Sequence, residues 1–360
     1  MPVEKVDVRT FLELANSNPI FDVRSPKEFA YAHIPGAFSL PIFDDDQRAE
    51  IGTTYKQISR QDAIKIGLKY FGPQLTAYIK TVEAALKKYP SNNNQKVLVH
   101  CWRGGMRSGA MAWLLGFYGF DVVLLEGGYK SYRNEVLQQL ALPYQFNVLG
   151  GYTGSGKTEV LHELKKHHVS VIDLEGIACH KGSSFGALGM DEQPSQEQFE
   201  NNLATQLAKY YYFDEQQHFN QTNPIWIENE SQRIGLLNLP KAFYETVLLG
   251  RLIVLNIPFE ERLGHILEHY GKFDSDKLVT ATMRIQKRLG GLDTKNAVTF
   301  LLEGNIKACF DVLLKYYDKQ YERSGERVGR KSVTFDSPVV NAKQNAALIL
   351  KQVINLNDNH

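Results

Sequence analysis

The sequence has few cysteines, almost no net charge and no long apolar run. Its three cysteines, Cys101, Cys179 and Cys309, are odd in number and far apart, which argues against a disulfide framework and fits a reducing cytosol. The first residues carry no long apolar stretch, so they do not predict a signal peptide. No run of about 18 apolar residues predicts a membrane span. We therefore expect a cytoplasmic protein without a membrane partner.

The charge balance is also uninformative about large partners. The formal net charge is +1, so the overall charge does not predict nucleic-acid binding, although a local basic face can suffice for it. Apolar residues make up 43% and charged residues 22% of the 360-residue chain, as in ordinary globular proteins. This length favours about two domains.

Two successive patterns of alternating strands and helices predict a two-domain α/β protein with parallel sheets. The expected strands of the first pattern are 19–24, 38–40, 96–100 and 121–125, with two or three helices between 44 and 89. Those of the second pattern are 146–149, 169–174, 224–228 and 251–257, followed by a mainly helical region after about residue 260. We expect a domain of residues 1–142 with a helical insertion, and a domain of residues 143–360 with a helical C-terminal region.

A glycine-rich turn with a cysteine follows the expected strand 96–100. Its sequence, HCWRGGMRS, leads directly into an apolar helix. The carboxyl end of a parallel strand is a ligand-binding position, and successive backbone N–H groups together with a helix N-terminus attract anions. Arg103 and Arg107 add cationic groups. All of these favour the thiolate of Cys101, which is the nucleophilic form, whereas a buried structural role is the default interpretation of Cys179 and Cys309.

A phosphate-binding motif follows the expected strand 146–149. The segment GYTGSGKT fits G-x-x-x-x-G-K-[ST], and it precedes an expected helix over 159–166 as this motif requires. Its backbone N–H groups would wrap phosphate oxygens, Lys157 would reach the terminal phosphates, and Thr158 is a candidate Mg²⁺ ligand. The predicted phosphate-binding residues are Gly151, Thr153, Gly154, Ser155, Gly156, Lys157 and Thr158.

Acidic residues follow two further strands of the second pattern. Asp173 and Glu175 come after 169–172, and Glu228 and Glu230 after 224–227. Either pair could organise Mg²⁺ through water. For each acid, a helix cap or a surface charge is an equally good interpretation. The sequence predicts no tightly bound cofactor, and no metal beyond this candidate Mg²⁺.

The first domain resembles a rhodanese domain. The resemblance rests on DVRSPKEF at 22–29, AHIPGA at 32–37, the Cys101 loop and EGGY at 126–129. It implies a cysteine that carries sulfur or selenium. Five residues separate Cys101 from Arg107, and this wider loop is similar to that of dual-specificity phosphatases rather than typical sulfurtransferases. Such a loop suits a tetrahedral oxyanion, either phosphate or selenophosphate.

The two domains together resemble the bacterial tRNA 2-selenouridine synthases over nearly the whole chain. Besides the two signatures, the segments GTTYK at 52–56, DLE at 173–175, HKGSSFG at 180–186 and ENESQRIG at 228–235 look like motifs of that family. The supporting residues taken from them are Asp173, Glu175, His180, Lys181, Glu228, Glu230 and Arg233.

This resemblance implies an enzyme that converts wobble 2-thiouridine to 2-selenouridine in the tRNAs for lysine, glutamate and glutamine. It further implies selenophosphate as selenium donor, selenophosphate synthetase as its supplier, and an S-geranyl intermediate made from geranyl diphosphate. By resemblance, His180 and Lys181 would contact phosphate or tRNA. A basic stretch, Arg323, Arg327, Arg330 and Lys331, is either a contact to the tRNA backbone or a solvated helix face.

Two other functions fit parts of the sequence. The Cys101 loop alone would allow a phosphatase, although no general acid is identifiable and the phosphate loop would have no role. The phosphate loop alone would allow a P-loop kinase with an inactive rhodanese-like binding module. The sequence leaves open whether the phosphate loop takes a nucleotide or a prenyl diphosphate.

Overall fold

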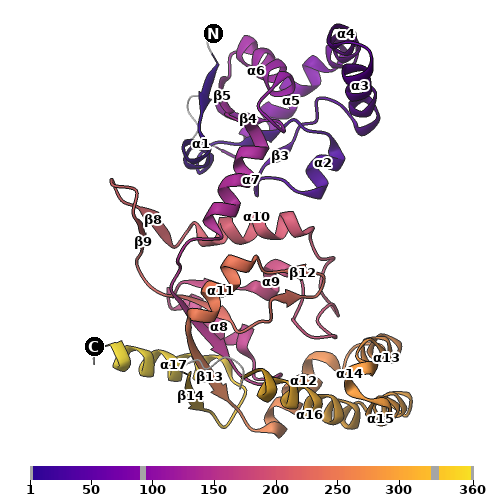
Figure 1. Cartoon of the computed structure of the whole chain (residues 1–360), viewed down its shortest axis with the longest axis vertical. Helices are drawn as coiled ribbons and strands as arrows, with labels where there is room; N and C mark the ends of the chain where they lie inside the picture. The colour runs from indigo at the N-terminus through magenta and orange to yellow at the C-terminus, as the bar shows by residue number, and fades with distance from the viewer. Residues whose placement is uncertain (1–2, 90–94, 326–331, 358–360) are drawn as a thin grey trace. The chain divides into compact units, whose positions relative to one another are not determined.

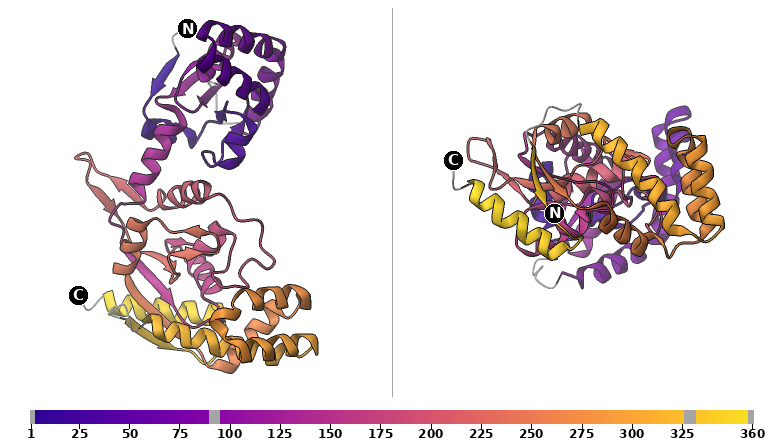
Figure 2. Two further views of the ribbon diagram at one scale, coloured as in Figure 1. Left: turned by 45° about the vertical axis from the view of Figure 1, so that its right-hand side comes forward. Right: turned by 90° about the horizontal axis from the view of Figure 1, so that it is seen from below.

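The computed structural model describes residues 3–89, 95–325 and 332–357. The chain separates into two compact units (Figures 1 and 2). The first contains the residues up to Gln139 together with Glu200–Asn202, and the second contains Leu140–Phe199 and the residues from Leu203 onward.

The first unit is built on a parallel sheet. Its strands lie in the order β1-β5-β4-β2-β3, and every neighbouring pair is parallel. In chain order its elements are β1 (Glu4–Val6), α1 (Val8–Ala15), β2 (Ile20–Asp22), α2 (Pro26–Tyr31), β3 (Phe38–Ser39), α3 (Asp45–Gln57), α4 (Arg60–Phe71), the 3-10 helix η1 (Gly72–Gln74), α5 (Leu75–Leu86), β4 (Lys96–His100), α6 (Met106–Tyr118), β5 (Asp121–Leu125) and α7 (Gly128–Gln139).

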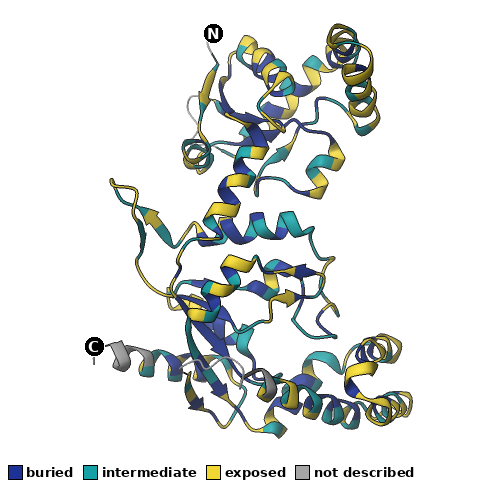
Figure 3. Ribbon diagram, in the orientation of Figure 1, coloured by how far each residue is buried: buried dark blue, intermediate teal, exposed yellow. Residues whose placement is uncertain are grey.

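Local sequence explains how this unit forms. The central strands β4 and β5 are apolar runs that are buried along almost their whole length, as expected when helices cover both faces of a parallel sheet (Figure 3). Helix α2 begins at Pro26, after a capping box formed by Ser25 and Glu28. The helical insertion expected between 44 and 89 is α3, α4 and α5.

The second unit is also built on a parallel sheet, in the order β14-β13-β6-β10-β7. In chain order its elements are β6 (Phe146–Gly150), α8 (Lys157–Lys166), β7 (Val171–Ile172), α9 (Leu174–Ala178), α10 (Gln196–Leu207), β8 (Tyr211–Phe213), β9 (Phe219–Gln221), β10 (Ile225–Glu228), β11 (Arg233–Ile234), β12 (Leu237–Asn238), α11 (Lys241–Leu249), β13 (Arg251–Asn256), α12 (Phe259–Tyr270), α13 (Ser275–Arg284), α14 (Gln286–Leu289), α15 (Gly291–Leu302), α16 (Ile306–Gly325), β14 (Ser332–Asp336) and α17 (Ala342–Asn357).

The sheet order of the second unit positions its site. Strand β6 is central, with β10 on one side and β13 on the other, and all three run in the same direction. Their carboxyl ends therefore lie at one edge, which is where ligands bind in such sheets. Two details differ from the expected strands: β7 is shorter because Asp173 caps α9 directly after it, and the edge strand β14 lies within the region expected to be mainly helical.

The α/β fold with parallel sheets and a helical C-terminal part is confirmed. Among the described residues, no helix is both long enough and apolar enough to cross a bilayer.

Candidate active site

The cysteine loop connects β4 to α6. Gly104 has φ +66°, in the left-handed region, which brings the backbone back over the sulfur. The loop is held by the start of α7: Tyr129 N donates to Cys101 O at 2.8 Å. A Cβ on Gly128 would lie 2.3 Å from that same oxygen, so only glycine fits there. The EGGY segment thus holds the cysteine loop in its turn.

The surroundings of Cys101 favour its thiolate. The side chain is buried, and the amide of Gly105 donates to the sulfur at 3.3 Å while the Ser108 hydroxyl lies 3.1 Å away. Burial acts to raise the pKa of the Cys101 thiol, but hydrogen bonds from Ser108 and from the backbone, together with the charge of Arg107, outweigh it and lower the pKa. Cys101 is therefore the cysteine with nucleophilic character.

The two other cysteines have the opposite electrostatics. Burial raises the pKa of Cys309, which is fully buried in α16, to about 12. Burial, with the charge of Asp191, also raises the pKa of Cys179. Both therefore remain thiols at neutral pH.

The two arginines of the loop differ in their settings. Arg103 is exposed. Arg107 donates to Glu28 of α2, with Nη1 2.7 Å from Oε2, and Glu28 also accepts from the amide of Ser25. Burial opposes ionisation of Glu28, but Arg107 is the main reason why the pKa of this carboxyl is lowered. Glu28 is thus a positioning residue for Arg107, and the sequence did not single it out.

A buried ion pair supports the same loop from the neighbouring strand. Arg24 and Asp22 are both buried, and the guanidinium donates to both carboxylate oxygens. The Arg24 guanidinium carbon also lies 3.8 Å from the centre of the Tyr129 ring, the residue whose amide holds Cys101 O. The DVRSP segment therefore fixes the base of the loop rather than the reacting group.

The phosphate loop connects β6 to α8 in the second unit. Gly154 and Gly156 have φ +84° and +68°, conformations that an L side chain rarely adopts. Lys157 Nζ donates to Gly151 O at 3.0 Å, so the ammonium group at the end of the loop contacts the backbone at its start. Ser155 is fully buried, and its hydroxyl donates to Tyr152 O.

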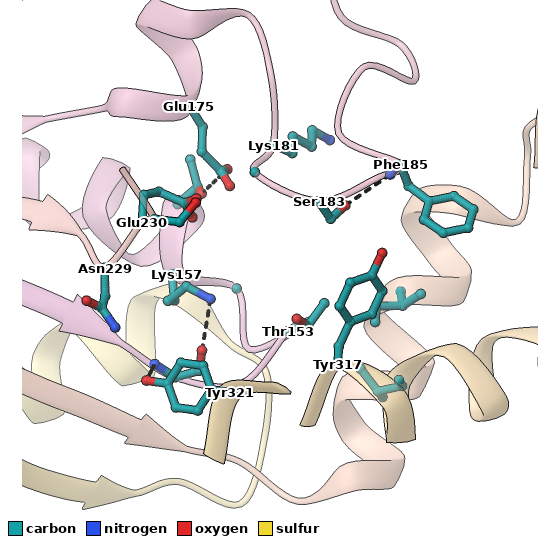
Figure 4. Close-up of a pocket in the computed structure, with 18 of the residues that line it drawn as sticks. Thr153, Lys157, Glu175, Lys181, Ser183, Phe185, Asn229, Glu230, Tyr317 and Tyr321 are labelled. Atoms are coloured by element: carbon teal, nitrogen blue, oxygen red, sulfur yellow. Dashed lines mark hydrogen bonds between the residues drawn. The ribbon is translucent and has the colours of Figure 1, made fainter. Parts of the chain in front are cut away.

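The loop forms one side of a cavity of about 1050 Å³. Every predicted phosphate-binding residue except Ser155 lines it. An apolar wall continues from the loop, and Figure 4 shows Phe185 and Tyr317 on the opposite side of the cavity from Lys157 and Glu230. Lining residues of this wall are Phe185, Ile266, Phe310, Leu313, Leu314 and Tyr317.

Acidic side chains gather beside Lys157 and Thr158. Thr158 Oγ1 donates to Glu175 Oε2 at 2.8 Å, and Glu175 and Glu230 both line the cavity. Burial raises the pKa of Glu230 to about 7, and the nearby charge of Glu175 contributes. Burial also raises the pKa of Glu175. A hydroxyl and carboxylates are the all-oxygen donor set that suits Mg²⁺.

The other acid at each strand end has a structural partner. Glu228 is fully buried and accepts from the amide of Leu174, and burial raises its pKa well above the ordinary value. It does not line the cavity. Asp173 does, but it also caps α9 by accepting from Gly176 N, and it lies 2.6 Å from His162 Nε2.

The three supporting basic residues are placed differently. Lys181 lines the cavity. His180 is buried beside it, and burial lowers its pKa. Arg233 is exposed on β11, outside the cavity lining, and donates to Gly235 O. The basic stretch Arg327, Arg330 and Lys331, and the side chain of Arg323, lie outside the described residues.

Residues from α12 and α16 hold the phosphate loop, and the sequence did not point to them. The guanidinium of Arg262 donates to Thr153 O at 3.1 Å and to both carboxylate oxygens of Asp318. The hydroxyl oxygen of Tyr321 accepts a hydrogen bond from Gly151 N at 2.9 Å. These residues are more than 100 positions from the loop, so no local pattern could identify them.

Comparison with known proteins assigns both units. The chain matches the tRNA 2-selenouridine synthase AAA domain over residues 144–344 and the rhodanese-like domain over residues 7–135. It is 36% identical over 299 residues to the tRNA 2-selenouridine synthase of Shewanella frigidimarina, covering 77% of each chain. It is 35% identical to that of Hydrogenovibrio crunogenus, covering 76% of each, and 33% identical to that of Shewanella piezotolerans, covering 89% of this chain and 93% of that one. This chain, with its reactive cysteine loop and its phosphate loop, belongs to the tRNA 2-selenouridine synthase family.

Proposed function

We propose that this chain is a tRNA-modifying enzyme that converts 2-thiouridine at the wobble position to 2-selenouridine. The tRNA substrate and the product are those in the names of its relatives. The acceptors we propose are the tRNAs for lysine, glutamate and glutamine, and the selenium donor is selenophosphate, supplied by a selenophosphate synthetase.

The observation that carries the route is the two-sided lining of the second-unit cavity. The phosphate loop and Lys157 are suited to a diphosphate, and the adjoining apolar wall is suited to a hydrocarbon chain. Geranyl diphosphate combines both groups in one molecule. A nucleotide would also use the loop, but its polar base and ribose would then lie against this apolar wall.

In the first step the 2-thio sulfur attacks C1 of the geranyl group. A C–S bond forms while the C–O bond breaks, diphosphate leaves with the electron pair, and the base loses its N3 proton to solvent. Lys157 and the backbone N–H groups of the loop stabilise the departing charge. If Mg²⁺ takes part, Thr158 and Glu175 are the residues that would hold it, and it would supply neutralisation of diphosphate charge.

In the second step selenium replaces the alkylated sulfur. The selenium of selenophosphate forms a C–Se bond at C2 of the base as the C–S bond breaks, and geranyl thiolate leaves with the electron pair and takes up a proton. Water then cleaves the Se–P bond, so that phosphate leaves and selenium stays on the base. A thiocarbonyl sulfur is a poor leaving group, and alkylation improves it. The lowered pKa of Cys101 and the anion-binding turn around it support assigning the handling of the selenium donor to this cysteine.

The route is tested by nucleoside mass spectrometry of tRNA from cells that carry single and double variants. Cys101→Ser should accumulate S-geranyl-2-thiouridine, because prenylation is intact. Lys157→Ala should leave 2-thiouridine, and the double variant should match Lys157→Ala. Geranylated base in Lys157→Ala but none in Cys101→Ser would show that the division of labour is wrong.

A further inference from the structure

Three side chains at one end of the second-unit cavity have no role in the reaction described above. Glu159 lies in the first turn of α8, two residues after Lys157, and His265 and His269 lie on α12. All three line the cavity. We propose that they form a binding site for a divalent metal ion of the zinc class.

The spacing of the ligand atoms fits such an ion. Glu159 Oε1 lies 3.7 Å from His265 Nε2 and 3.7 Å from His269 Nε2, and one ligand atom from each residue lies within 4.8 Å of the others. Tetrahedral zinc with ligand bonds of about 2.0–2.1 Å separates its ligand atoms by roughly 3.4 Å. The two carboxylate–imidazole distances are therefore within a few tenths of an ångström of this value, and the two imidazole ligand atoms, which lie within 4.8 Å of each other, would move closer around an ion.

The backbone already arranges the two histidines. Residues four apart on a helix share a face, and the imidazole rings of His265 and His269 are 4.3 Å apart between centres. Two imidazole nitrogens beside one carboxylate oxygen are donors that a divalent cation can bind together.

The donor set separates this site from the magnesium ligands proposed above. Mg²⁺ prefers oxygen donors, as Thr158 and Glu175 provide, whereas two imidazole nitrogens with one carboxylate favour zinc and its neighbours in the first transition series. Three protein ligands also leave a coordination position open, which is the arrangement of catalytic rather than structural zinc.

The phosphate loop lies directly beside these side chains. A Cβ on Gly156 would lie 3.6 Å from Glu159 Oε2 and 3.9 Å from His265 Nε2. The fourth ligand of the ion would therefore be water or an oxygen of an anion bound by the phosphate loop. The side chains are accessible to an incoming ion, since Glu159 is 43% and His269 38% exposed.

The test uses the full chain, stripped of metal with a chelator and titrated with Zn²⁺ alone against a chromophoric competitor. The result does not depend on the proposed tRNA chemistry. We expect a site that His269→Ala and Glu159→Gln each weaken by about 100-fold or more, because losing a direct ligand costs at least as much as losing its supporting partner. Circular dichroism should show both variants folded, since the side chains are half-exposed and the second change keeps the shape.

His162→Ala is the matched control. His162 lies on α8, as Glu159 does. It lines the same cavity and is 53% exposed, but it is paired with Asp173 instead. It should bind Zn²⁺ as the unchanged chain does. Substituted Co²⁺ should give the visible bands of nitrogen and oxygen ligands without a near-ultraviolet thiolate band. The proposal would be overturned if the unchanged chain did not bind Zn²⁺, if His269→Ala and Glu159→Gln bound it as tightly as the unchanged chain does, or if Co²⁺ showed thiolate ligation.

Discussion

Ser108 Oγ lies 3.1 Å from the sulfur of Cys101 and 3.2 Å from Gly105 O. The single hydroxyl proton can serve only one of these acceptors at a time. When Cys101 is a thiol, its own proton can be donated to Ser108 while the hydroxyl donates to Gly105. When Cys101 ionises, the hydroxyl proton is the one available to turn towards the sulfur. The pair therefore has a hydrogen bond in both states, and the one to the thiolate is the stronger.

Removal of this hydroxyl should raise the pKa of the Cys101 thiol. Ser108→Ala takes away the hydrogen bond that lowers that pKa most, while the burial that raises it stays. The pH at which alkylation by iodoacetamide reaches half its maximal rate should move up, so that alkylation at neutral pH slows. Ser108→Thr, which keeps a hydroxyl, is the control. An unchanged pH profile in Ser108→Ala would show that the backbone amides and Arg107 are sufficient.

The three cysteines should differ in their importance for activity. Cys101→Ser should abolish formation of 2-selenouridine without loss of fold, because serine cannot supply a thiolate. Cys179→Ser and Cys309→Ala should retain it, since the pKa values of both thiols are raised and neither side chain lines the cavity. The measurement is 2-selenouridine in tRNA incubated with each variant and selenophosphate. Full selenation by Cys101→Ser would refute the assignment.

Lys157→Ala should weaken diphosphate binding in the second-unit cavity and slow prenylation on the order of 10²-fold, as loss of one group aimed at developing charge does elsewhere. Calorimetry with geranyl diphosphate and a prenylation assay would measure the two effects. Lys166→Ala is the control, because Lys166 lies at the other end of the same helix, is exposed and pairs with Glu163. If both variants behave alike, the GYTGSGKT segment is only a structural turn.

The largely buried pair of Arg262 and Asp318 should be important for stability of the second unit. Arg262→Met would leave Asp318 without its cation and Thr153 O without its donor, which we expect to cost about 3–5 kcal/mol in the free energy of unfolding. Lys315→Met is a suitable comparison: it breaks a largely exposed pair with Asp311 on the same helix, where the expected cost is within about 1 kcal/mol. Urea denaturation of both variants measures the difference. Equal costs would mean that Arg262 stabilises neither the phosphate loop nor the packing of α12 against α16.

Some strands were harder to predict than others for a physical reason. The expected strands 96–100 and 121–125 have the same bounds in the structure because each is a continuous apolar run between turns. Strands β1 and β14 lie at the sheet edges, and their burial patterns are mixed, so no such run marked them. Their strand conformation comes from pairing with β5 and β13.

The sequence by itself determined the two motifs around which the proposed chemistry is built, the cysteine loop and the phosphate loop. Both are made from consecutive residues whose function depends on local backbone shape, so glycines, a helix start and one reactive side chain suffice to reveal them. Only the tertiary structure decided which distant residues complete them. Glu28 reaches Arg107, Arg262 reaches Thr153, and Glu159 meets two histidines of α12, because parallel strands and the helices between them bring separate segments to one edge of a sheet.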